Sequence, residues 1–218
     1  MISTGFILST FDLTEVFYQF SREQEEYDLD EIILTLAISS IYLSIFILRR
    51  FMELKAALIK ANTDPLIGIF NRRKGSEYIV EVIGNLKYKN TNASIIMFDI
   101  DDFKKVNDNH GHDIGDYVLK KTIAILENII RDGDILIRWG GEEFIALCPN
   151  TDLAGSSLLA ERFRKSIEEY DFDKVRKVTA SFGVIELNAS NNLREQIVKV
   201  DGNLYKSKHN GKNQVFAG

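Results

Sequence analysis

Residues 135–147, ILIRWGGEEFIAL, contain the clearest structural signal in the larger part of this chain. Two short, mostly apolar runs, residues 135–139 and 142–147, lie on either side of the pair Gly140-Gly141. Paired glycines supply the positive φ angles that a two-residue turn between antiparallel strands needs. The stretch therefore predicts a β-hairpin that carries two carboxylates, Glu142 and Glu143, beside its turn.

Helical and strand-like segments alternate on both sides of this hairpin. Strands interleaved with helices, together with one antiparallel hairpin, predict an α+β fold in which helices flank a central sheet that contains antiparallel strands. We expect helices at residues 72–88, 103–107, 117–130, 153–170 and 193–208, and further strands at residues 93–99, 177–186 and 214–216.

The beginning of the chain has a different composition. Residues 32–48 include no charged side chain, and they are bracketed by two acids before and two arginines after. As a helix they would reach about 26 Å, close to the thickness of a hydrocarbon core. We therefore expect one transmembrane helix over residues 31–50; a buried or dimer-interface helix of a soluble protein is the alternative.

The charges around this helix predict its orientation. Residues 1–30 hold one arginine against seven acids, whereas Arg49, Arg50, Lys55 and Lys60 follow the apolar run. Lys and Arg near a span favour the cytoplasmic side. We expect a single-pass protein of the inner membrane, with a short acidic extracytoplasmic segment first and everything after the span in the cytoplasm.

Residues 51–62 are predicted to be a linker helix between the span and a domain at residues 63–218. Phe51, Leu54, Leu58 and Ala61 recur at the spacing of an a/d stripe. Such a stripe could pair two subunits, or it could pack on its own domain.

Charge and cysteine content limit the possible functions. The net charge of −5 gives no general attraction to nucleic acid, so we expect no nucleic-acid partner and only a few placed cations for any phosphate. The single cysteine, Cys148, lies in the apolar run FIALC, which excludes a disulfide within the chain and predicts a buried thiol.

Carboxylates gather at two predicted strand ends. MFDIDDF, residues 97–103, finishes an apolar strand with three acids, and RWGGEEF, residues 138–144, places two more beside the turn. Acids brought together in this way need a cation between them, and hard oxygen ligands favour Mg²⁺ or Mn²⁺ over zinc. The alternative is that these acids belong to solvated turns. No His/Cys pair with zinc spacing and no GxxxxGK[ST] loop supports a rival chemistry.

Five motifs occur together over residues 63–218. They are DPLIGIFNRR, FDIDDFKKVNDNHGHDIGD, RDGD, RWGGEEF and YKSKHNGKN. In this order and spacing they resemble the GGDEF family of diguanylate cyclases, in the GGEEF form of its motif. The resemblance implies an enzyme that condenses two GTP molecules into cyclic di-GMP and two pyrophosphates, as a homodimer with Mg²⁺ or Mn²⁺.

The resemblance also implies roles for single residues. Asp99 and Glu142 would bind the metal through their side chains, and Ile100 through its backbone carbonyl. Glu142, or Glu143 beside it, would accept the proton of the attacking hydroxyl group. Asn107 and Asp116 match the family's guanine readers, and His112 falls on a family position near the nucleotide. The triphosphate would be held by Lys104, Lys208, Lys212 and Arg138, assisted by amide groups near Asp102 and Phe103 at a helix start. Lys212 departs from the family, which usually has arginine there, so a bidentate phosphate contact would become a point contact.

RDGD resembles the family's inhibitory site for its product. Arg131 can fork onto the O6/N7 edge of guanine while Asp134 accepts from its N1–H and N2–H groups. A helix-to-strand turn rich in Asp and Gly is the alternative interpretation.

Two other functions remain open from the sequence. A non-catalytic receptor would bind GTP or cyclic di-GMP without turnover and signal to a partner. A cyclase of a different nucleotide would prefer another base.

Overall fold

A computed structural model of the protein describes Gln19, residues 29–89 and residues 91–218. The chain divides into two compact units between Leu58 and Ile59. Most of the acidic segment predicted at residues 1–30 lies outside the described residues.

One long helix, α2 (Leu29–Asn62), contains both the predicted span and the predicted linker. Its residues Glu31–Asn62 are long and apolar enough to cross a membrane, with a mean hydropathy of 2.2 in the most apolar window. The Ser40 hydroxyl donates to the Ala37 carbonyl at 2.7 Å, and Ser44 donates to Ser40 at 2.8 Å. These back-bonds satisfy the hydroxyl groups within the helix, as an apolar surrounding requires.

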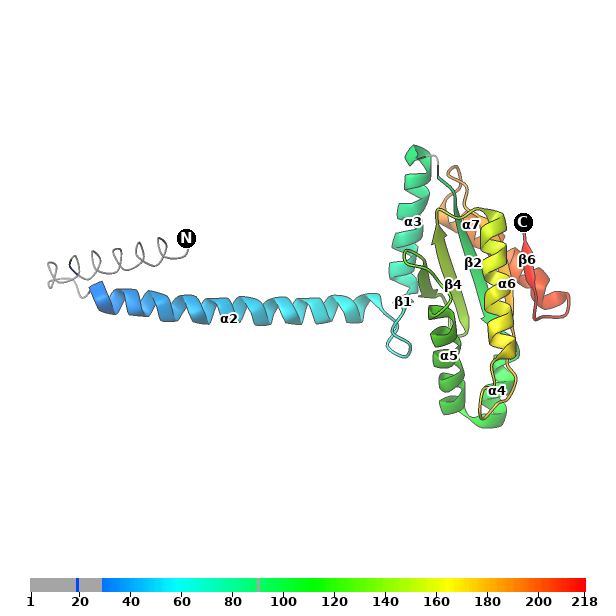
Figure 1. Ribbon diagram of the computed structural model, residues 1–218, viewed down its shortest axis with the longest axis horizontal. Coiled ribbons are helices and arrows are strands. Elements are labelled where there is room, and N and C mark those ends of the chain that lie inside the picture. Colours follow the sequence, from blue (N-terminus) through cyan, green and yellow to red (C-terminus); the bar gives the residue numbers. More distant parts are fainter. Residues whose placement is uncertain (1–18, 20–28, 90) are drawn as a thin grey trace, which may run out of the picture. The chain divides into compact units, whose positions relative to one another are not determined.

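The unit that begins at Ile59 is built on a six-stranded sheet of order β1-β3-β4-β2-β5-β6 (Figure 1). The central strand β2 runs antiparallel to both of its neighbours, β4 and β5. The edge strand β1 runs parallel to β3, and the other edge strand, β6, runs parallel to β5. The α+β prediction is confirmed. The strands are β1 (Phe70–Asn71), β2 (Ala93–Ile100), β3 (Ile135–Arg138), β4 (Glu143–Pro149), β5 (Ala180–Glu186) and β6 (Val215–Ala217), and the helices are α3 (Arg72–Lys89), α4 (Phe103–His110), α5 (His112–Glu127), α6 (Leu153–Glu169) and α7 (Leu193–His209).

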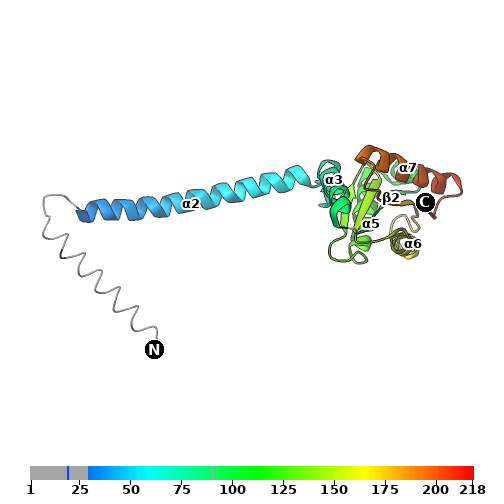
Figure 2. The same ribbon diagram turned by 90° about the horizontal axis from the view of Figure 1, so that it is seen from above.

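Helices cover both faces of this sheet. Ile96 and Phe98 of β2 belong to the core shared with α5 and α6, whereas Ile95 and Met97 belong to the core shared with α3 and α7. Figure 2 shows α7 and α6 on opposite sides of β2. All eight residues of β2 are buried, as expected for a strand with helices on both faces.

Some element boundaries differ from the sequence prediction, and helix α4 continues to His110. Strand β1 was not predicted, because two residues are too short to show alternation. Helix α5 begins at His112, five residues before the predicted start. Strand β5 begins at Ala180 because its partner β2 ends at Ile100, opposite that residue. Strand β4 begins at Glu143, so Glu142 lies in the turn.

The thiol of Cys148 is buried in β4, as predicted. Burial raises the pKa of this thiol to about 12.

Gly183 in β5 lets helix α7 approach the sheet closely. A Cβ atom there would collide with the backbone of Val200, Asn203 and Leu204. Gly183→Ala should therefore lower the free energy of unfolding by about 1–3 kcal/mol, because the helix backbone has to shift. The matched control is Gly202→Ala within α7, where a methyl group meets no atom within 4 Å and should add about 0.5–1 kcal/mol of stability. Urea denaturation of both variants measures the difference, and equal stability would contradict the close packing.

Candidate functional site

Acidic side chains from two adjacent strands meet at one end of the sheet. Asp99, the last acid within β2, pairs directly with Glu143 of β4 and with Ser181 of β5. Glu142 precedes Glu143 in the hairpin turn. Asp99 is 4% exposed, and both glutamates are half-buried. The two predicted carboxylate clusters are thus brought together.

Lys208 of α7 reaches this cluster and forms an ion pair with Asp99, with 2.8 Å between Nζ and Oδ2. Burial nevertheless raises the pKa of Asp99 to about 6, with Lys208 opposing the shift and the charges of Glu142 and Glu143 adding to it. Burial also raises the pKa of Glu142, again against the effect of Lys208. The site is therefore short of positive charge, which favours binding of a cation.

The donor atoms fit a hard divalent cation. Carboxylate and carbonyl oxygens are the ligands that Mg²⁺ and Mn²⁺ prefer. Among the described residues, no three Asp, Glu, His or Cys side chains converge closely enough to hold an ion by themselves. The predicted set has two carboxylates and the Ile100 carbonyl, so substrate oxygens and water would have to complete the coordination.

Arg138 clamps the glycine turn. Its guanidinium group forms an ion pair with Asp64 at 2.9 Å and donates to the Gly141 carbonyl at 2.7 Å and to the Gly140 carbonyl at 3.2 Å. The side chain of Glu143 lies against Gly140, where a Cβ atom would collide with its carboxylate. Arg138 thus fixes the turn that carries Glu142, and its predicted contact with the triphosphate stays a prediction. The role of Asp64 was missed, although its motif was recognised.

The predicted guanine-reading residues lie on α4 and α5. Asn107 packs against Gly115, where a Cβ atom would collide with the Asn107 side chain, and Gly115 is next to Asp116. The two helices are joined by Gly111, whose φ of 85° lies in the region that glycine adopts most easily. Asn107 is therefore held near the start of α5, and the exposed His112 opens that helix. Sequence reasoning missed the packing role of Gly115.

Of the predicted phosphate ligands, Lys208 and Lys212 lie near the acids of β2 and the loop after it, whereas Asp102, Phe103 and Lys104 lie at the start of α4. Lys208 pairs with Asp99 inside β2, and Lys212 reaches the loop after β2, where its Nζ atom lies 2.9 Å from Asp102 Oδ2. Asp102 has a left-handed φ of 55° and precedes α4, whose first residue, Phe103, is buried. Lys104 is exposed on α4. The structure thus places two of the predicted lysines beside the acidic cluster.

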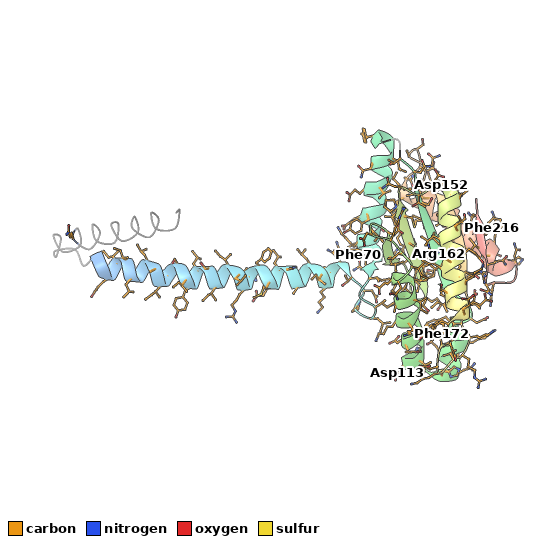
Figure 3. The ribbon with its side chains drawn as sticks, in the orientation of Figure 1. Phe70, Asp113, Asp152, Arg162, Phe172 and Phe216 are labelled. Carbon is orange, nitrogen blue, oxygen red and sulfur yellow. The ribbon has the colours of Figure 1, made fainter. Side chains whose placement is uncertain are left out.

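Arg131 and Asp134 line an open pocket with Arg162 of α6. Figure 3 labels Arg162 on that helix. Nε of Arg131 lies 3.3 Å from Asp134 Oδ1, and Nη2 donates to the Pro149 carbonyl at 2.7 Å. Arg162 was missed because it follows RDGD by 28 residues and belongs to none of the motifs. The two guanidinium groups at this pocket suit the O6/N7 edge of guanine, whereas the Asp134 side chain is 2% exposed and is bonded to Arg131.

Comparison with known protein families matches residues 61–214 to "Diguanylate cyclase, GGDEF domain". This range covers most of the chain and contains strands β1 to β5, the acidic cluster and the lysines. The chain belongs to the GGDEF family.

Individual relatives support this assignment. Diguanylate cyclase VdcA of Vibrio cholerae is 36% identical over 174 residues, which cover 75% of this chain and 50% of VdcA. The active GGEEF domain of a diguanylate cyclase from Vibrio cholerae is 33% identical with a TM-score of 0.65, over 67% of this chain and 96% of that one. The coiled coil and GGDEF domain of DgcB from Caulobacter crescentus share the fold at 22% identity with a TM-score of 0.79, over 84% of this chain and 99% of that one. This chain spans about half the length of VdcA.

Proposed function

We propose that this chain is a diguanylate cyclase that condenses two GTP molecules into cyclic di-GMP and two pyrophosphates. The observation that carries the proposal is the meeting of Asp99, Glu142 and Glu143 beside Lys208 at the end of the central strands. Family membership and relatives that are themselves diguanylate cyclases support it.

Guanine is the base that Asn107 and Asp116 suit. The carboxylate of Asp116 accepts from the N1–H and exocyclic amine that guanine offers together, and Asn107 supplies both a donor and an acceptor. Adenine would leave the carboxylate unpaired, which is costly in a site that excludes water. His112 is the first residue of α5, the helix that carries Asp116, and completes this part of the proposed site.

Charge placement supports phosphoryl transfer at the acidic cluster. Lys208 and Lys212, with Lys104 from α4, would bind the triphosphate. Glu142 would accept the proton of the 3′-hydroxyl group of one GTP. The 3′ oxygen would then bond to the α-phosphorus of the other GTP, and the bond between that phosphorus and the leaving pyrophosphate would break. Mg²⁺ or Mn²⁺ held by Asp99, Glu142 and the Ile100 carbonyl would stabilise the developing negative charge when bound.

Two active sites have to face each other for this reaction, because each GTP attacks the other. We propose that the chain acts as a homodimer anchored in the inner membrane through residues 32–48, with the catalytic domain in the cytoplasm. Phe51, Leu54 and Leu58 of α2 are 54–62% exposed and offer an apolar stripe for pairing. The pocket of Arg131, Asp134 and Arg162 is where we propose that cyclic di-GMP binds and inhibits.

The decisive experiment incubates residues 1–218 in detergent micelles with GTP and Mg²⁺. Mass spectrometry should detect cyclic di-GMP, and pyrophosphate should appear in equal amount to the GTP consumed. ATP in place of GTP should give no cyclic product. Binding of GTP or cyclic di-GMP without turnover would instead favour the non-catalytic receptor, which remains the second candidate.

A further inference from the structure

Asn213 connects the loop that carries Lys212 to the end of α6. Its side-chain amide group donates to Glu168 Oε1 at 2.8 Å, and its side-chain oxygen accepts from Arg164 Nη1 at 2.9 Å. Arg164 is itself held by ion pairs to Glu161 at 2.8 Å and Glu168 at 2.7 Å, and its side chain is only 13% exposed. The side chain of Asn213 is therefore fixed by partners that are fixed in turn.

The main chain of Asn213 bonds to the residue that follows β2. Its N–H group donates to Asp101 Oδ2 at 3.0 Å. Asp101 is 7% exposed and also accepts from the hydroxyl groups of Ser181 at 2.7 Å and Thr179 at 2.8 Å. Because Asp101 directly follows β2, Asn213 ties the loop after β2 to the loop before β6.

The backbone between these anchors is strained. Lys212 has a φ of 63° and Asn213 a φ of 46°, so two successive residues with side chains adopt the left-handed conformation. The Lys212 N–H group donates to the Ser207 carbonyl at 3.1 Å, and its Nζ atom lies 2.9 Å from Asp102. Such a turn persists only where neighbouring contacts hold it, and the three bonds of Asn213 are among those that do so.

We propose that Asn213 is a positioning residue for the substrate triphosphate, which acts by holding Lys212 at the end of β2. The N–H group, the side-chain oxygen and the side-chain amide of Asn213 all bond to the protein, so the residue works through Lys212 rather than by touching substrate. The inference rests on the proposed function, because it takes Lys212 as a phosphate ligand.

The test is a double-mutant cycle in the chain of residues 1–218 in detergent, with Asn213→Gly, Lys212→Ala and the double variant. Glycine accepts the left-handed backbone, so Asn213→Gly removes the side-chain anchor without adding backbone strain. Calorimetry measures binding of guanosine 5′-[α,β-methylene]triphosphate, which cannot be condensed, and of GMP. Asn85→Ala on the exposed face of α3 is the control and should change neither affinity.

Asn213→Gly should weaken triphosphate binding about tenfold and GMP binding less than about twofold, as Lys212→Ala should. In the double variant the loss should not exceed that of Lys212→Ala alone. Additive losses, or equal losses for triphosphate and GMP, would overturn the inference. Glu168→Ala, at a half-exposed position on α6, removes one anchor of Asn213 without altering the loop. Like Asn213→Gly, it should weaken triphosphate binding more than GMP binding.

Formation of cyclic di-GMP by the wild-type chain tests the proposed function separately from the role of Asn213. If it forms cyclic di-GMP while the cycle is additive, only the role of Asn213 fails. If it forms none while the cycle shows coupling, only the proposed function fails.

Discussion

Glu142→Gln is expected to lower the rate of cyclic di-GMP formation by about a thousandfold or more. The substitution keeps the size of the side chain and removes both its negative charge and its capacity to accept a proton. Glu142 lies beside Asp99 and Lys208 at the point where we place the reacting phosphate, so both losses fall on the chemical step. Pyrophosphate release under saturating GTP and Mg²⁺ measures the effect.

Two further variants make this result specific. Glu127→Gln, at an exposed position at the end of α5, should leave the rate unchanged. Glu143→Gln tests the neighbouring carboxylate, which lies against Gly140; it should retain more activity than Glu142→Gln if Glu142 is the base. A Glu142→Gln variant with wild-type turnover would remove the basis of the proposed mechanism.

Asp99→Asn is expected to make the protein more stable and, at the same time, much less active. Burial raises the pKa of Asp99 to about 6, above the ordinary value of 3.8. The charged form is therefore disfavoured in the folded state, and replacing it with a neutral amide should add about 1–3 kcal/mol of stability at pH 7. Turnover should fall by at least about a hundredfold, because the proposed metal loses a carboxylate ligand.

The same reasoning predicts a pH dependence. The folded protein binds the Asp99 proton more tightly than the unfolded chain does, so this group makes the wild type lose stability as pH rises from about 4 through about 6. Urea denaturation in EDTA at pH 5 and pH 7 should show a smaller difference in Asp99→Asn than in the wild type. An Asp99→Asn variant less stable than the wild type at pH 7 would show that the pairing with Lys208 outweighs burial.

Much of the fold could be predicted because local sequence patterns determine its hairpin and its central strand. The glycine pair between two apolar runs predicted the hairpin, and the apolar run that ends at Asp99 predicted the central strand with its acids at one end. The convergence of Asp99 with Glu142 and Glu143 also followed, since neighbouring strands end together.

The roles that were missed depend on contacts between distant segments. Asp64 meets Arg138 across 74 residues, and Arg162 meets the RDGD turn only because α6 packs beside it. Gly115 shows its role only when α4 and α5 are placed against each other. No spacing rule in the sequence reports such neighbours, because they follow from tertiary packing.

The buried thiol of Cys148 makes the chain convenient for labelling. With no exposure and a pKa of about 12, this thiol will not react with maleimides while the protein is folded. A cysteine introduced at the exposed Leu54 would then be the one reactive group, so a spin label could be attached there with the native sequence otherwise intact. Distances between two such labels would report directly whether α2 helices pair in a bilayer.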